Sequence, residues 1–175
     1  WSCELRSFDP IIGDELAEEQ RLQSEAMALT GGARVEFQGE LKTLPAVAAF
    51  LTSPDRAIRR AAAEARWGWC AEHREVLDRH FDDLVRVRHD ISSKLGRGSF
   101  TELAYDRMRR TDYGPDDVAL FRSAIEEHVV PLVEEIRSRQ AEALGLDGLS
   151  IFDEGVHGPG ESPTPGGDAP WMEDR

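Results

Sequence analysis

The sequence contains few cysteines, no long apolar run and no excess of positive charge. Its two cysteines, Cys3 and Cys70, cannot form a framework of several disulfides, and Cys70 is predicted to be a buried thiol in a helix. No run approaches the ~18 apolar residues of a membrane span, and no secretory signal is visible. The sequence therefore predicts a soluble protein of a reducing compartment, the cytoplasm, with no membrane partner.

The acidic balance argues against a protein that binds nucleic acid. The formal net charge is -13, from 34 acidic and 21 basic side chains. Such a field repels a phosphate backbone, and the basic clusters at residues 59–60 and 107–110 are small and flanked by acids. We therefore expect no nucleic-acid partner. With 40% hydrophobic and 31% charged residues, the composition suits a folded, charge-rich helical protein.

The spacing of the apolar residues predicts a mainly α fold of long antiparallel helices with one small β-hairpin. Helices are expected over residues 14–29, 44–51, 53–95, 99–108 and 114–145, and the hairpin over residues 35–43. From residue 153 to residue 170 the chain is rich in proline and glycine, which predicts a long loop. Trp171 is expected to begin the next element.

Side chains at the expected helix ends support these boundaries. The predicted N-caps are Asp14, Thr43, Ser53 and Ser99. Glu102 follows Ser99 at the spacing of a capping box. Glycines at residues 31–32, 96 and 98 are predicted to end helices. In the last helix, Pro131 cannot donate a hydrogen bond to the preceding turn, so we expect a bend there.

Several blocks of the sequence, taken in order, resemble one family of enzymes. The block from Ser53 to Tyr113 resembles the stretch that precedes the zinc site in oligoendopeptidase F, a bacterial relative of thimet oligopeptidase. The similarity extends to FDPIIGDELAEEQRLQSEAMAL at residues 8–29, ARVEFQGELKTL at 33–44, the helix at 113–149 and PTPGGDAPW at 163–171. Its most specific element is ELAYDRMRRTDY at residues 102–113.

The resemblance implies a fold, an activity and a cofactor. Members of this family are large, mostly helical zinc metalloendopeptidases shaped like a clamshell, and their channel admits short peptides and excludes folded proteins. Two histidines of a His-Glu-x-x-His motif and a glutamate on a later helix hold the zinc, and the glutamate of the motif is the general base. The intact enzyme would hydrolyse internal bonds of short peptides.

This sequence contains no His-Glu-x-x-His motif. It also begins at Trp1 and ends just after a new helix is expected to start, so we expect an internal fragment that is inactive alone and binds no zinc. The resemblance then divides the chain into three parts. Residues 1–52 would end the N-terminal region, residues 53–152 would be a long-helix segment at the start of the peptidase domain, and residues 153–175 would lead to the next helix.

The sequence itself supplies no catalytic or metal-ligating residue that we can name. The two closest histidines, His73 and His80, would lie ~10 Å apart on a helix, too far to share one zinc ion. Adjacent acids point about 100° apart on a helix, so they are predicted to form a solvated face rather than a catalytic dyad. These acid pairs lie at residues 82–83, 116–117, 126–127 and 134–135.

The best remaining candidates lie in a helix-to-loop corner and are Arg107, Arg109, Arg110 and Tyr113. An arginine fork there could brace a carboxylate from another part of the full protein, and we favour this bracing over contact with substrate. The substrate-binding residues remain unassigned. Trp67 and Trp69 could line a peptide groove, but aromatic residues beside an apolar stripe usually belong to a core.

An alternative function stays open at this point. A truncated or decayed relative could be a non-catalytic helical module that binds peptides or proteins along its exposed apolar stripes. Helical faces that lack a neighbour would also favour self-association of the fragment. An enzyme segment and an interaction module are therefore the two functions that the sequence allows.

Overall fold

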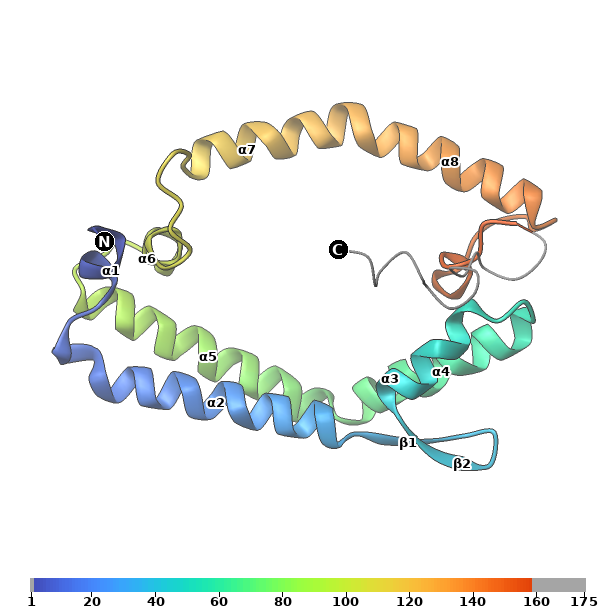
Figure 1. Cartoon of the computed structure of the whole chain (residues 1–175), viewed down its shortest axis with the longest axis horizontal. Coiled ribbons are helices and arrows are strands. Elements are labelled where there is room, and N and C mark those ends of the chain that lie inside the picture. Colours follow the sequence, from blue (N-terminus) through green and yellow to red (C-terminus); the bar gives the residue numbers. More distant parts are fainter. Residues whose placement is uncertain (1, 159–175) are drawn as a thin grey trace, which may run out of the picture. The chain divides into compact units, whose positions relative to one another are not determined.

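The computed structural model describes residues 2–158 (Figure 1). It is mainly α, with one small sheet of two strands, as the sequence predicts. The described residues pack as two compact units, one of residues 2–34 and 68–131 and the other of residues 35–67 and 132–158. The predicted loop beyond residue 158, and the helix start at Trp171, lie outside the described residues. The domain boundaries at residues 52 and 152 concern the whole family protein and stay a prediction.

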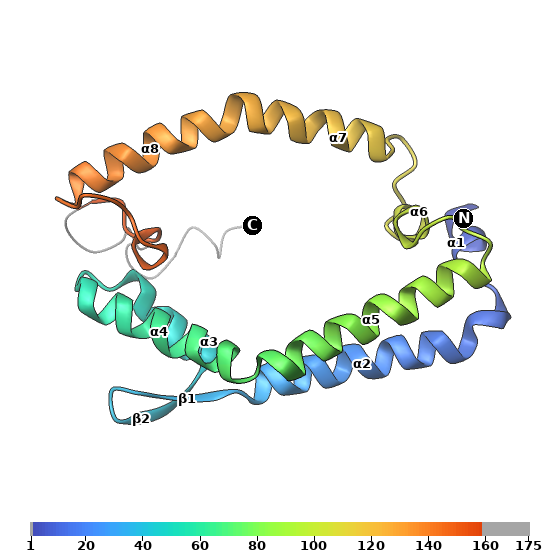
Figure 2. The ribbon, with the colours of Figure 1, turned by 180° about the vertical axis from the view of Figure 1, so that it is seen from behind.

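The first unit is built on two long helices, α2 (Gly13–Gly32) and α5 (Arg74–Lys94), which lie side by side in Figure 1 and, from behind, in Figure 2. The ion pairs between them join Glu15 to Lys94 and, further along α2, Glu19 to the earlier Arg88. The two helices therefore run antiparallel. Shorter elements complete the unit, namely α1 (Ser2–Ser7), the 3-10 turn η1 (Pro10–Ile12), α6 (Phe100–Arg107) and α7 (Pro115–Ala124).

The core of this unit joins η1, α5 and α6. Ile12, Ile91 and Leu103 are fully buried, and partly buried side chains that include Leu16 and Phe100 pack against them. Full burial of an aliphatic side chain stabilises a fold by about 1.5–3 kcal/mol. This apolar cluster therefore anchors α6 to the pair of long helices.

The ends of α2 differ from the prediction. The helix follows η1 directly, and Ile12 holds the N-cap position without a side-chain hydrogen bond. The predicted cap at Asp14 is wrong, because Asp14 lies in the first turn, where its charge favours the positive end of the helix. The capping carboxylate of this region belongs to Asp9 and caps η1. The glycines at residues 31–32 remain helical, so they do not supply the expected left-handed stop.

The hairpin lies where the sequence places it. Its strands are β1 (Arg34–Phe37) and β2 (Glu40–Thr43). Gln38 and Gly39 join them, with φ angles of 54° and 76°. Two left-handed residues in succession form a type I′ turn, whose twist matches that of the flanking strands. The Gln-Gly pair is therefore sufficient to close this hairpin.

The second unit packs the hairpin on short helices. Thr43 caps α3 (Leu44–Ala48) as predicted, since its hydroxyl accepts the Ala46 N–H at 3.2 Å, and the 3-10 turn η2 (Ala49–Thr52) follows. The core consists of Phe37, Val47 and Ala62, with Phe50 at 4.9 Å between ring centroids from Phe37. These contacts bury one face of the hairpin, which could not persist alone.

The long helix predicted over residues 53–95 is two helices. The first, α4, spans Arg56–Glu72, and α5 begins after His73, whose φ of -100° and ψ of 11° leave the helical region. The imidazole of His73 stacks on the Trp69 ring at 4.2 Å, and its Nδ1 lies 2.9 Å from the Trp69 carbonyl oxygen. A side chain that bonds the carbonyl of the preceding turn stabilises such an interruption.

The start of α4 also differs in detail. Asp55 accepts the Ala57 N–H at 2.8 Å and therefore caps the helix, whereas the predicted cap, Ser53, bonds the Asp55 N–H. Among the residues predicted to be core, Trp69 is buried but Trp67 is 57% exposed. The prediction that Cys70 is buried is also wrong, since Cys70 is half-buried. The buried cysteine is Cys3.

The remaining helix ends largely confirm the prediction. Gly96 ends α5 with a φ of 68°, and the Ser99 hydroxyl caps α6 by accepting the Glu102 N–H at 3.4 Å. The Glu102 carboxylate bonds the N–H of Gly98 rather than that of Ser99. None of the helices described between residues 2 and 158 is long and apolar enough to cross a membrane.

The last predicted helix is continuous in sequence but changes its hydrogen bonding midway. After α7, residues Ile125–Val129 form a π-helical turn, and α8 (Val130–Ala143) follows. Pro131 lies directly after this turn and has no N–H to donate, which disturbs the preceding turn. Where a bend was expected at Pro131, the structure has a π turn just before that proline. Gly145 ends the helical region with a φ of 67°.

A buried ion pair closes the second unit. Asp153 ends the 3-10 turn η4 (Ile151–Asp153) and is fully buried. Its carboxylate accepts bonds from Arg59, itself 3% exposed, at 2.8 Å and from Arg56 at 2.9 Å. Gln140 of α8 donates to the Asp153 carbonyl at 3.2 Å and so adds a third connection. These contacts join α4, α8 and η4, which are distant in sequence.

Two opposing effects set the pKa of Asp153. Burial alone raises the pKa, but hydrogen bonds from Arg56, Arg59 and the Ser150 backbone N–H outweigh it and lower the pKa to about 2 from 3.8. Because the folded state releases its proton more readily, this carboxylate stabilises the fold fully above about pH 4. The stabilisation is lost as the pH falls through the folded-state pKa.

We predict that Asp153→Asn lowers the free energy of unfolding by about 3 kcal/mol at pH 7, because Arg59 is left buried without its carboxylate. Urea denaturation followed by circular dichroism measures this. The difference from the wild type should shrink as the pH is lowered from about 5 to about 2. Asp147→Asn, at an exposed position, is the matched control and should change stability little. A difference that stayed constant over this pH range would contradict the prediction.

Candidate functional site

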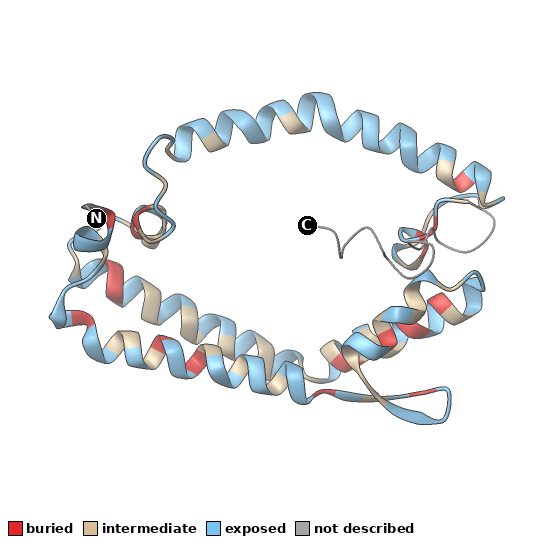
Figure 3. Cartoon of the chain, viewed as in Figure 1, coloured by how far each residue is buried: buried red, intermediate tan, exposed pale blue. Residues whose placement is uncertain are grey.

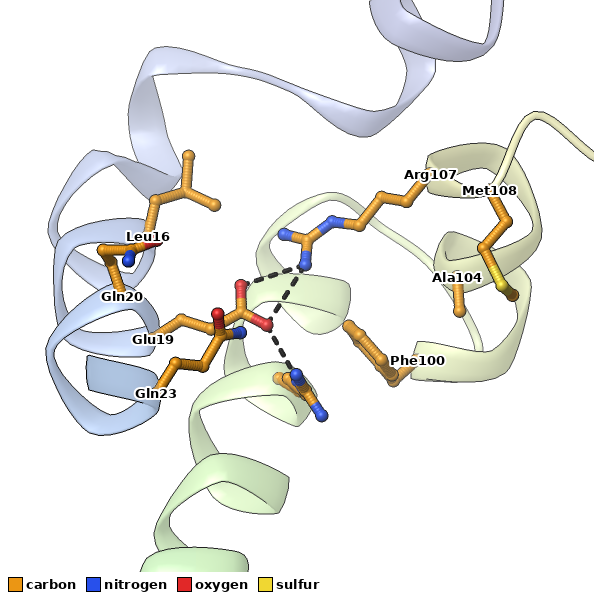
Figure 4. A pocket seen from close by; sticks show the side chains of 9 residues that line it. Leu16, Glu19, Gln20, Gln23, Phe100, Ala104, Arg107 and Met108 are labelled. Atoms are coloured by element: carbon orange, nitrogen blue, oxygen red, sulfur yellow. Dashed lines mark hydrogen bonds and ion pairs between the residues drawn. The ribbon is translucent and has the colours of Figure 1, made fainter. Parts of the chain in front are cut away.

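The candidate site of the first unit is centred on Glu19, an acid of α2 that is only 6% exposed. Arg88 of α5 donates to one carboxylate oxygen at 2.7 Å, and Arg107 of α6 donates to the other at 3.0 Å. Figure 4 shows the carboxylate facing the Arg107 guanidinium, with Phe100 beside them. One buried negative charge therefore binds three separate helices together.

An open hollow of about 500 Å³ surrounds this carboxylate. Phe100 forms one side, and its ring centroid lies 5.4 Å from the guanidinium carbon of Arg88 and 5.5 Å from that of Arg107. An arginine at this distance from an aromatic ring is held by a cation–π attraction as well as by its ion pair. The other lining residues are Leu16, Gln20, Gln23, Ala104 and Met108.

Helix α6 also carries the acid of a second cluster. Asp106 of α6 is 9% exposed and accepts bonds from Arg97 at 2.7 Å and from Arg6 of α1 at 2.8 Å. Arg97 also donates to the backbone carbonyl of Arg6 at 3.1 Å. The carboxylate of Asp106 therefore joins α1 and the α5–α6 connection to α6.

The corner after α6 holds the other predicted candidates. Arg109 has a left-handed φ of 55° and pairs with Glu4 at 2.5 Å on the surface. The Arg110 guanidinium lies over two rings, 4.9 Å from the centroid of Tyr105 and 5.6 Å from that of Tyr113. These contacts are cation–π attractions at an exposed site, each worth roughly 0.5–1 kcal/mol.

The bracing role predicted for this corner is found for Arg107, with one correction. The carboxylate that Arg107 braces is Glu19 of this same chain, whereas we expected one from another part of the full protein. Arg109, Arg110 and Tyr113 do not join that cluster. The two acids at the cluster centres, Glu19 and Asp106, are missed by the sequence analysis, because nothing in a charge-rich helix distinguishes a buried acid from a solvated one.

The described residues do not form a metal site. Between residues 2 and 158, no three histidine, cysteine, aspartate or glutamate side chains lie close enough to hold an ion. The adjacent acids are exposed as predicted, except that Asp83 is half-buried; Asp83 pairs with Arg86 and Glu135 with Arg139. Asp117 instead accepts the Gly114 N–H at 2.8 Å and caps α7. The described residues therefore do not fit the zinc that the resemblance implies.

Three solved structures are similar to the chain over 98% of its length. PZ peptidase A with an inhibitor has a TM-score of 0.92 and 42% sequence identity. A protein assigned as oligoendopeptidase F from Bacillus anthracis str. Ames has a TM-score of 0.89 and 38% identity, and another protein assigned as oligoendopeptidase F, solved at 3.1 Å, has 0.91 and 40%. The chain is therefore similar, in sequence and in fold, to one segment of the peptidases in these structures.

The chain belongs to the oligoendopeptidase F family. It spans 30–31% of the length of the three related structures. No family model matches the chain, and no curated protein matches it. The clusters around Glu19 and Asp106 are therefore features of one segment of an oligoendopeptidase F fold.

We predict that Glu19→Gln lowers the free energy of unfolding by about 2–4 kcal/mol, because Arg88 and Arg107 lose the only charge that both contact within the described residues. Urea denaturation at neutral pH measures this loss. Glu18→Gln is the matched control, since the neighbouring Glu18 side chain is 43% exposed and pairs with Arg21, and it should cost below about 0.5 kcal/mol. Equal losses for the two variants would show that the Glu19 cluster is not buried in solution.

Proposed function

We propose that the chain is part of a zinc-dependent oligoendopeptidase of the cytoplasm that hydrolyses internal bonds of short peptides. The observation that carries this proposal is the 38–42% identity to oligoendopeptidase F and PZ peptidase structures over 98% of the chain. Identity of this degree supports a shared activity as well as a shared fold. The substrates proposed are peptides, as the names of these relatives indicate.

In this proposal the chain is a scaffold and not the reaction centre. Glu19 and Asp106 each fasten helices with two arginines, which supports a rigid wall of the enzyme. No catalytic residue is assigned within the chain, and its described residues do not fit a zinc ion. The zinc ligands and the general base are proposed to lie in the part of the family protein that this chain does not span.

A second function is favoured by one observation. Several large apolar side chains are exposed, among them Leu120 at 74% and Phe121 at 65%. A chain with such a surface could act as a non-catalytic module that binds peptides or proteins, or itself. This module would bind partners without cleaving peptides, so an activity assay separates the two functions.

We predict that the 175-residue chain alone does not hydrolyse a quenched fluorescent peptide. A chimera of PZ peptidase A, in which this chain replaces the matching 30% of that protein, should hydrolyse the peptide. A chelator should abolish the activity of the chimera, and added zinc should restore it.

The unmodified PZ peptidase A is the positive control for the assay. Chelator-sensitive hydrolysis by the isolated chain would contradict the scaffold role. A folded chimera without activity would argue against the enzyme segment and favour the interaction module. Circular dichroism of the chimera establishes that it is folded before this comparison is made.

A further inference from the structure

Helix α7 and the π turn that follows it contain no buried residue among those described. Figure 3 shows the exposure along α7, and the large Phe121 is 65% exposed. We define the α7 face as Val118, Phe121 and Ile125, which recur at helical spacing. Val118 and Ile125 are half-buried, so Phe121 is the most exposed member of this face. An exposed apolar patch on a helix marks an interaction surface, and the α7 face is therefore a candidate docking surface.

The start of α7 also contains an apolar hollow of about 460 Å³. Tyr113, Val118 and Phe121 line it together with the charged Arg110 and Asp117. The guanidinium of Arg110 contacts two tyrosine rings but makes no ion pair within residues 2–158. A partner with an apolar side chain next to a carboxylate would fill the hollow and pair with Arg110.

Two occupants can be compared on charge and on length. A second copy of this chain also carries a net charge of -13, so the two copies repel one another. The matched segment makes up 30–31% of each related chain. More than two thirds of each relative therefore lies outside it. The remainder of the family polypeptide is the occupant that both observations favour.

We propose that the α7 face and its hollow form a docking surface for the part of the oligoendopeptidase F polypeptide that this chain does not span. The docked part inserts an apolar side chain beside Phe121 and places a carboxylate on Arg110. This inference rests on the proposed function, because both assume that the chain is part of a longer protein of the oligoendopeptidase F family. It concerns association alone, so its test measures amide exchange and not hydrolysis.

The test compares hydrogen–deuterium exchange of the peptide covering residues 115–129 in the isolated chain and in the chimera with PZ peptidase A. In the isolated chain these amides should exchange fast, because no residue described in α7 or in the π turn is buried. In the chimera their exchange should slow by at least about 100-fold. Slow exchange in a chimera without peptidase activity would support docking and would contradict the proposed function.

A pair of variants locates the contact. Phe121→Asp in the chimera should speed exchange of this peptide by at least about 10-fold, because it places a charge in the apolar hollow. Ala119→Asp is the matched control, since residue 119 is exposed and lies about 200° around the helix from residue 121. It should leave the exchange unchanged. Equal effects of the two variants would overturn the assignment of this face.

Two further outcomes would overturn the proposal. Fast exchange of α7 in a folded chimera would show that nothing docks there. Slow exchange in the isolated chain that depends on its concentration would show that a second copy is the occupant.

If the chimera does not fold, the tagged chain is co-expressed with the remaining part of PZ peptidase A. Capture should occur with the Ala119→Asp chain and fail with the Phe121→Asp chain, and failure to capture with the unmodified chain also overturns the proposal.

Discussion

The structure depends on carboxylates that are withdrawn from water and shared between arginines. Glu19 and Asp106 in the first unit, and Asp153 in the second, each accept bonds from two guanidinium groups on other elements. The apolar clusters of both units are small, with three buried members each. Directional, charge-assisted bonds therefore specify which helices meet, since a small apolar cluster could be packed in several ways.

Most of the fold could be predicted from the sequence, because its signals are local. The Gln38–Gly39 turn, the Thr43 cap and the Gly96 stop act within a few residues of themselves and lie where expected. The break at His73 could not be predicted, because the apolar stripe continues through it and no glycine or proline marks its position. The cap at Asp14 failed because a 3-10 turn precedes the helix.

The candidate site could be predicted only in part, for the same reason. The family resemblance directed attention to Arg107, which does brace a carboxylate, but its partner Glu19 lies 88 positions away in the sequence. Asp153 and Arg59 are 94 positions apart, and neither carries a sequence signal of burial. Pairing between distant helices is decided by tertiary packing, so a single sequence without its structure contains no record of these partners.

The arginine clusters also change how the charge of the chain is distributed. Each buried carboxylate faces two guanidinium groups, so each cluster carries a local excess of positive charge. The surface outside these clusters consequently carries a larger negative charge than the net charge of -13 of the whole chain. Such a surface attracts cationic solutes and repels anionic ones, and dissolved salt weakens both effects. Basic peptides would therefore accumulate near this segment faster than acidic peptides of the same length.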